Sequence, residues 1–98
     1  MTTFLVMLRR SGPAWHASLP PEEQSDRLPH ADYMDSLVET GFLVLGGPLA
    51  DEHRVVLVCE AESEDVVRER LAQDPWSESH LQIDAVERWR VRLDGRRR

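Results

Sequence analysis

Histidine is the side chain best suited to acid–base chemistry near neutral pH, and this 98-residue chain contains four of them. His16 is expected in a loop, His53 in a hairpin turn and His80 in an irregular stretch after a helix, so we interpret these three as surface residues. His30 differs because it stands at the start of a predicted helix, on the same side of that helix as Tyr33. Two interpretations remain for His30: a general base, or a partly buried histidine satisfied by the backbone or by water.

The stretch "AQDPWSESH" (72–80) places a carboxylate and a tryptophan on either side of a proline, where another predicted helix ends. Pro75 explains the helix end, because a proline ring cannot continue a helix. If Asp74 contacts His30, it fixes one imidazole tautomer and raises the basicity of the ring, as a general base requires. The alternative is structural, with Asp74 starting a turn and Trp76 filling the core. If the protein is an enzyme, we predict that His30 and Asp74 are its catalytic pair.

Four residues are predicted to bind a substrate beside this pair. Trp76, Tyr33 and Met34 supply an apolar wall, and Arg9 receives an anionic group, although two arginines of the last predicted strand are equally available. The tripeptide "GGP" (46–48) is either a strand end packed against a neighbour or a further wall of the pocket. We predict no metal site and no cofactor, because no histidine pairs at i, i+4 with another ligand type.

The composition narrows the possible partners. A formal net charge of −6 argues against nucleic acid, because phosphate backbones require a basic surface. The single cysteine, Cys59, excludes an internal disulfide and lies in the apolar run "VVLVCEA". No apolar run approaches the ~20 residues of a membrane span, and the first ten residues do not resemble a signal peptide. We therefore expect a cytoplasmic protein that takes a small-molecule ligand and has no nucleic-acid or membrane partner.

Six segments have the periodicity of a strand or of a helix. Their order, βαββαβ, is that of the ferredoxin-like α+β fold, a four-stranded antiparallel sheet with two helices on one face. We expect one domain over residues 1–98, of which 93–98 form a flexible basic tail, and an apolar face made by the odd-numbered residues of the last strand. The predicted segments are strands 2–9, 42–47, 54–61 and about 82–93, helices 29–41 and 64–73, and a proline-rich loop 10–24. In an alternative interpretation, the first helix begins at about residue 22 and is kinked at Pro29.

A single layer of helices leaves the other face of the sheet open. Segment 2–9 is apolar on both faces, and segment 42–47 also has apolar groups to bury there. A chain this short buries only about two-thirds of its unfolded surface, so association with a second copy stabilises it. We therefore predict a homodimer in which two sheets pack face to face, a dimeric α/β barrel.

Two segments carry a resemblance to a known family. The stretches "PHADYMDSLVETGFLVLGGPL" (29–49) and "AESEDVVRERLAQDPWSESHL" (61–81) resemble the YCII-related (YciI-like) family of the dimeric α/β barrel superfamily. The shared order is a histidine at a helix start, a glycine-ended helix, a strand closing on "GGP" and an acid–proline–aromatic element. The resemblance implies a dimerising ferredoxin-like fold with a pocket whose histidine and aspartate, here His30 and Asp74, are proposed as an active site. A few relatives resemble lyases acting on chlorinated ring-cleavage lactones, and others have no assigned activity.

Two functional hypotheses follow. In the first, the protein is a small cofactor-independent enzyme, a lyase, isomerase or dehalogenase-like catalyst for a small organic acid or lactone, with the His30–Asp74 dyad in a pocket near the dimer interface. In the alternative, it is a non-catalytic dimeric module of the same fold that binds a small molecule or has a regulatory role. A third interpretation gives the pair a structural role alone. Turnover separates the first from the second, and loss of ligand binding without loss of folding in His30→Ala separates the second from the third.

Overall fold

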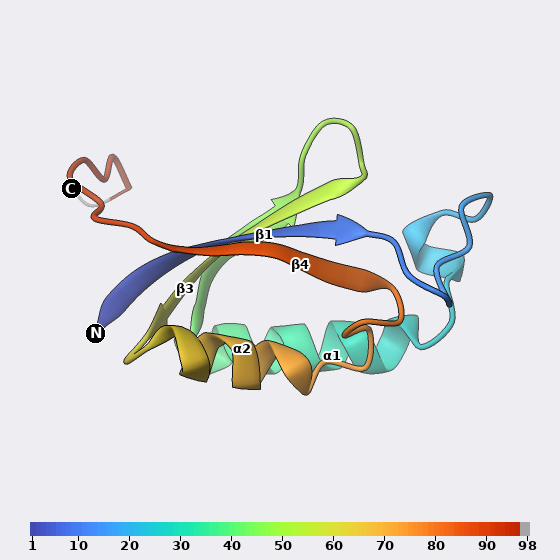
Figure 1. The fold of residues 1–98 in the computed structure, drawn as a ribbon, viewed down its shortest axis with the longest axis horizontal. Helices are drawn as coiled ribbons and strands as arrows, with labels where there is room; N and C mark the ends of the chain where they lie inside the picture. Colours follow the sequence, from blue (N-terminus) through green and yellow to red (C-terminus); the bar gives the residue numbers. More distant parts are fainter. Residues whose placement is uncertain (97–98) are drawn as a thin grey trace.

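The computed structural model describes residues 1–96, which form one four-stranded sheet covered on one face by two α-helices (Figure 1). The strand order is β2-β3-β1-β4, and each strand is antiparallel to its neighbours. This arrangement confirms the predicted ferredoxin-like α+β fold. The elements are β1 (Thr2–Arg10), the short 3-10 helix η1 (Pro21–Glu23), α1 (Arg27–Glu39), β2 (Leu43–Pro48), β3 (Arg54–Ala61), α2 (Glu64–Ala72) and β4 (Leu81–Arg88).

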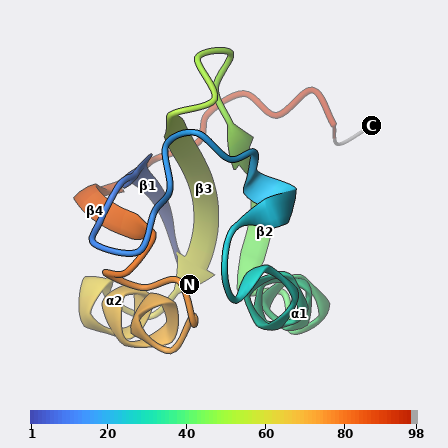
Figure 2. The ribbon, with the colours of Figure 1, turned by 90° about the vertical axis from the view of Figure 1, so that its right-hand side faces the viewer.

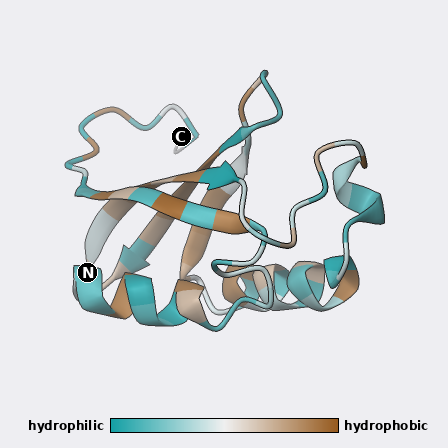
Figure 3. Ribbon diagram, turned by 45° about the vertical axis from the view of Figure 1, so that its right-hand side comes forward, coloured by the Kyte–Doolittle hydropathy of each residue, from teal (hydrophilic) through white to brown (hydrophobic). Residues whose placement is uncertain are grey.

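The core lies between the sheet and the helices. Along β1, the even-numbered side chains Phe4, Val6 and Leu8 are buried, and the apolar side chains between them are half-buried on the opposite face. β3 repeats this alternation along its whole length. Hydrophobic residues recur along the strands, and hydrophobic and hydrophilic residues alternate along the helices (Figure 3). Since β1 and β3 present apolar groups to both sides, the face without helices keeps apolar surface.

β4 is shorter than predicted, and its side chains do not alternate between the two faces of the sheet as predicted. It ends at Arg88, before the predicted end of the strand. Its pairing with β1 also shifts, because Met7 pairs with Ala85 whereas Leu8 pairs with Ile83. The prediction that the odd-numbered residues share one face was wrong. The extra residue of this bulge turns Ile83 toward the helices and Ala85 toward the open face.

Both helices lie close to their predicted positions. α1 begins at Arg27 rather than at residue 29, and Pro29 occupies its first turn, where a missing N–H group is tolerated. Gly41 follows the end of α1 with a φ of 83°, the left-handed conformation that favours glycine. Ser63 caps α2 as predicted, since its Oγ accepts a hydrogen bond from the backbone N–H of Val66 at 3.3 Å.

The two helices run in opposite directions beneath the sheet, so α1 begins at the end of the molecule where α2 ends (Figure 1). The loop between β1 and α1 covers this same end (Figure 2). The buried side chain of Gln24 holds the loop together: its Oε1 accepts from the His16 N–H at 2.9 Å, and its Nε2 donates to the His16 carbonyl at 2.7 Å and to the Leu19 carbonyl at 2.9 Å. The predicted proline-rich loop is therefore ordered by one amide side chain.

After β4 the chain continues on the side of the sheet away from the helices (Figure 1). The Trp89 N–H donates to the Thr3 carbonyl at 2.9 Å, and the Arg96 guanidinium pairs with the Asp94 carboxylate at 3.0 Å. The predicted basic tail, 93–98, includes residues 97 and 98, which lie outside the described part of the chain. In residues 1–96 no helix has the length and apolar character needed to cross a bilayer.

Candidate functional site

The two candidate catalytic residues meet where α1 begins and α2 ends. His30 lies in the first turns of α1, and Asp74 follows the last residue of α2 by two positions. A hydrogen bond of 2.7 Å joins His30 Nδ1 to Asp74 Oδ1. The Asp74 side chain is 5% exposed and the His30 side chain 18% exposed, so the bond is largely shielded from water. Such shielding strengthens a hydrogen bond between a carboxylate and an imidazole.

Asp74 also builds the turn that holds it in place. Its Oδ1 accepts a second hydrogen bond, from the backbone N–H of Trp76 at 3.0 Å, and its own N–H donates to the Leu71 carbonyl at 3.2 Å. The first of these bonds spans Pro75 and closes a side-chain turn. From the sequence, Asp74 had two alternative interpretations: it starts a turn, or it contacts His30. One carboxylate oxygen makes both contacts.

The indole of Trp76 lies between two imidazole rings. It stacks on His30 with ring centroids 4.0 Å apart and planes inclined by 7°, and on His80 at 4.9 Å and 13°. Trp15 packs edge-on against the same indole at 5.8 Å. The indole Nε1 donates to the Ser25 carbonyl at 2.8 Å. Together these contacts fix the plane against which the His30 ring lies.

His80 is buried, with 1% of its surface exposed, so the prediction that it is a surface residue was wrong. Both ring nitrogens have hydroxyl partners: Ser25 Oγ lies 2.9 Å from Nε2, and Ser79 Oγ lies 2.8 Å from Nδ1. Burial lowers the pKa of His80, because the charged imidazolium loses its hydration. Ser25 is distant in the sequence, and no local pattern indicated this burial.

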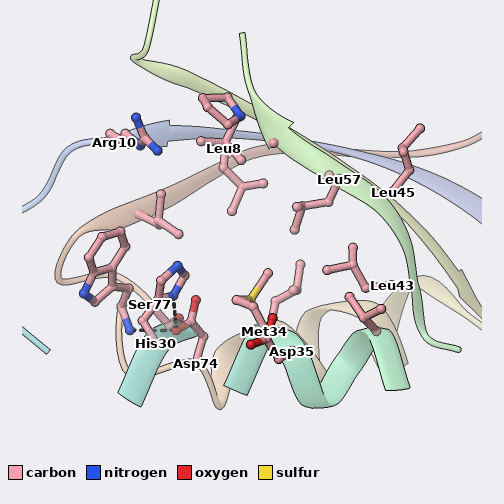
Figure 4. Close-up of a pocket in the computed structure, with 18 of the residues that line it drawn as sticks. Leu8, Arg10, His30, Met34, Asp35, Leu43, Leu45, Leu57, Asp74 and Ser77 are labelled. Atoms are coloured by element: carbon pink, nitrogen blue, oxygen red, sulfur yellow. Dashed lines mark hydrogen bonds and ion pairs between the residues drawn. The ribbon is translucent and has the colours of Figure 1, made fainter. Parts of the chain in front are cut away.

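A cavity of about 470 Å³ lies beside the dyad, between α1 and the sheet (Figure 4). Met34 lines it from α1, and Leu8 and Leu57 line it from the sheet. Figure 4 shows the second ring nitrogen of His30 directed toward this space, while the first is bonded to Asp74. The charged and hydroxyl-bearing lining residues are Arg10, His30, Asp35, Asp74 and Ser77. The rest of the lining is mainly aliphatic, which suits a small ligand with an apolar body.

The "GGP" segment forms part of the cavity wall. Gly46, Gly47 and Pro48 all line the cavity, which favours the second of the two interpretations given to this tripeptide. A Cβ atom added at Gly46 would lie 2.6 Å from Leu57 Cδ2. A side chain at position 46 would therefore displace the end of the Leu57 side chain, which also lines the cavity.

Two of the four predicted substrate-binding residues line the cavity, and the other two do not. Trp76 and Met34 line the cavity, and Tyr33 does not. The Tyr33 hydroxyl donates to the Arg70 carbonyl at 2.5 Å and so joins α1 to α2. Burial raises the pKa of Tyr33, an effect that outweighs the nearby positive charge of Arg70.

Arg10, rather than Arg9, lines the cavity. Arg9 lies on the open face of the sheet, where its Nε is 2.8 Å from Asp84 Oδ1. Arg10 lies on the helix side, two residues after the buried Leu8, because strand side chains alternate. Arg10 was not among the predicted residues, because β1 is apolar on both faces and the structure is needed to show that Leu8 and Arg10 face the helices.

A family model described as YCII-related domain matches residues 3–91 of the chain. No curated protein matches the sequence significantly. The matched span includes α1, β2, β3, α2 and β4 in full and nearly all of β1. Both members of the His30–Asp74 pair and the residues stacked on them lie inside it.

Replacing Asp74 by asparagine separates its two roles, because asparagine also supports the turn but lacks the charge. We expect neutral His30 in the wild type to carry its proton on Nδ1, and the share of this tautomer to fall in Asp74→Asn. The ¹⁵N chemical shifts of the two ring nitrogens, recorded at alkaline pH, measure the tautomer. Asp35→Asn is the matched control, since Asp35 lines the same cavity and makes no bond to His30. An unchanged tautomer in Asp74→Asn would contradict the assigned role of the carboxylate.

The buried His80 makes stability depend on pH. The unfolded chain takes up a proton on this residue near pH ~6.5, whereas the lowered pKa of the folded state resists it. The free energy of unfolding is therefore greatest above about pH 6.5 and decreases as the pH falls through the folded pKa. We expect His80→Asn to show a smaller decrease between about pH 7.5 and about pH 5 in urea titrations. His16→Asn is the control and retains the wild-type decrease; an equal decrease in His80→Asn would refute the assignment.

Proposed function

Because the chain belongs to the YCII-related family, we propose that it is a small cofactor-independent enzyme that removes a proton from a small organic acid or lactone. The observation that carries this proposal is the 2.7 Å hydrogen bond between His30 Nδ1 and Asp74 Oδ1 at the edge of a 470 Å³ cavity. A carboxylate that accepts from one ring nitrogen leaves the other with a lone pair available to a substrate. The remaining lining needs only to hold the substrate and to exclude water.

In the proposed reaction, His30 Nε2 takes a proton from a carbon next to a carbonyl group of the substrate. The electron pair of that C–H bond forms a C=C bond to the carbonyl carbon, and the C=O π pair moves to the oxygen to give an enolate. A lyase or dehalogenase reaction follows if the enolate re-forms its carbonyl and expels, with its electron pair, a leaving group from the next carbon. An isomerisation follows if the enolate is conjugated and the proton returns from His30 at another carbon. Asp74 stabilises the imidazolium that forms, and the stacked Trp76 keeps the ring in the plane required for transfer.

A non-catalytic module that binds a small molecule, or regulates through such binding, is the second candidate. The mainly aliphatic lining of the cavity favours it, because binding alone requires apolar surface and few polar groups. The two candidates use the same cavity and differ in whether His30 exchanges a proton with the ligand. A cytoplasmic location stays a prediction in either case.

We also propose that the protein is a homodimer joined through the open face of the sheet. The half-buried side chains of Leu5, Met7 and Val58 lie on this face, and Leu45 and Trp89 are 55% and 44% exposed. Leu45 borders both the cavity beside His30 and a groove on the open face that Val58 and Trp89 also line. Pairing of two such faces buries apolar surface and puts the interface next to the cavity.

The proposed proton transfer is tested by hydrogen exchange. Small organic acids and lactones are incubated with the protein in D₂O, and the loss of the signal from C–H groups next to the carbonyl is followed by ¹H NMR. We expect His30→Gln to slow the exchange by roughly 10²- to 10⁴-fold, because the general base is lost. His16→Gln is the matched control and retains the wild-type rate. Exchange that persists at the wild-type rate in His30→Gln would assign the proton transfer to another group.

The homodimer is tested by placing a charge on the open face. We expect Val58→Arg to shift the protein from dimer to monomer in sedimentation equilibrium, because an arginine facing another sheet is desolvated without a partner. Leu28→Arg is the control, since Leu28 is 65% exposed in the first turn of α1, and this variant is expected to remain a dimer. A wild-type protein that sediments as a monomer, or a dimeric Val58→Arg, would place the interface elsewhere or exclude it.

A further inference from the structure

The guanidinium group of Arg10 stands at the edge of the cavity and is poorly accessible to solvent. Arg10 is the last residue of β1 and lies on the helix side of the sheet. Only 12% of its side chain is exposed, and it lines the cavity together with Leu8 and Trp76 (Figure 4). A charged group held in this way requires partners that replace its lost hydration.

The partners that the protein supplies are incomplete. Arg10 Nη1 donates to the Glu52 carbonyl at 2.9 Å, and the carboxylate of Glu52 lies 3.5 Å away. That carboxylate belongs to a side chain that is 67% exposed, so water weakens the pair. Arg10 Nε is buried and has no hydrogen-bond partner within residues 1–96, and Nη2 makes no bond to these residues either. The guanidinium carbon also lies over the ring of Trp15, 5.8 Å from its centroid, a cation–π contact that uses no N–H donor.

We propose that Arg10 is an anion subsite of the cavity and takes the carboxylate of a small, otherwise apolar organic acid. This inference rests on the proposed function, because it names the substrate class of the same cavity. A guanidinium with unused N–H donors is the protein group that best matches a carboxylate, which it binds through two parallel hydrogen bonds. The bound carboxylate supplies an acceptor for Nη2, the unpaired donor that is not buried, whereas the buried Nε is not counted among the contacts.

The charges of the cavity limit the ligand to a single negative charge. The charged or titratable lining residues are two basic ones, Arg10 and His30, and two acidic ones, Asp35 and Asp74. Asp74 is already bonded to His30, so Arg10 is left to neutralise the ligand. A phosphate or dicarboxylate would add a second negative charge near Asp35 without a second cation. A monocarboxylic acid with an aliphatic or aromatic body fits both the charge and the apolar walls.

Benzoate and benzamide test the subsite, because they have the same shape and differ in charge. Binding is followed through the indole N–H signal of Trp76 in ¹H–¹⁵N spectra. We expect the wild type to bind benzoate more tightly than benzamide, and Arg10→Gln to weaken benzoate binding about tenfold or more without changing benzamide binding. Arg9→Gln is the matched control, since Arg9 is adjacent and lies on the other face of the sheet. Equal affinities of the wild type for the two probes, no binding of benzoate, or unchanged benzoate affinity in Arg10→Gln would each overturn the proposal.

A second measurement avoids any variant of the buried arginine. Phenylglyoxal modifies arginine side chains, and mass spectrometry locates the modified residue in the wild-type protein. We expect benzoate to slow modification of Arg10 and to leave that of Arg9 unchanged, and benzamide to protect neither. Equal modification of Arg10 with and without benzoate would overturn the subsite.

The same probes distinguish this inference from the proposed catalysis. If exchange in D₂O is absent while Arg10-dependent benzoate binding is present, the catalytic proposal fails and the carboxylate subsite stands. If exchange depends on His30 but benzoate binding does not depend on Arg10, the subsite fails and the catalytic proposal stands.

Discussion

One carboxylate oxygen organises the end of the molecule where the two helices meet. Asp74 Oδ1 accepts from the backbone N–H of Trp76 at 3.0 Å and from His30 Nδ1 at 2.7 Å. A carboxylate that is 5% exposed is stable only with such partners, and each hydrogen bond to a charged group contributes about 1.5–3 kcal/mol. Removing either bond leaves buried charge uncompensated. The end of α2, the turn after it and the orientation of His30 therefore depend on the same atom.

Trp76 extends this organisation to the long loop between β1 and α1. Its ring stacks between His30 and His80, and its Nε1 donates to the carbonyl of Ser25, which ends that loop. The Ser25 hydroxyl in turn contacts His80 Nε2 at 2.9 Å. Ser25 thus joins the loop to Trp76 through its carbonyl and to His80 through its hydroxyl. The stacking of Trp76 on His30 joins the turn after α2 to the start of α1. A proline-rich segment that belongs to no sheet is thereby held against Trp76.

The fold was predictable because its elements carry local patterns, apolar runs in the strands and apolar residues at helical spacing in the helices. The bounds of β3 and the serine cap of α2 followed from local pattern, since neither depends on distant residues. The bulge in β4 did not, because it arises from pairing with β1. Burial of His80 depends on Ser25, a residue that is far away in the sequence. β1 is apolar on both faces, so its sequence alone does not show that Arg10 and not Arg9 falls on the helix side.

The antiparallel arrangement of the helices has a consequence for folding kinetics. His30 belongs to the first βαβ half of the chain and Asp74 to the second, and 44 residues separate them. Neither half contains a complete site, and closure of this long loop costs conformational entropy before the hydrogen bond forms. The His30–Asp74 hydrogen bond therefore forms only when the two halves dock. In a nascent or partly unfolded chain His30 and Asp74 lie apart, so local unfolding of either helix end separates the pair before the core is lost.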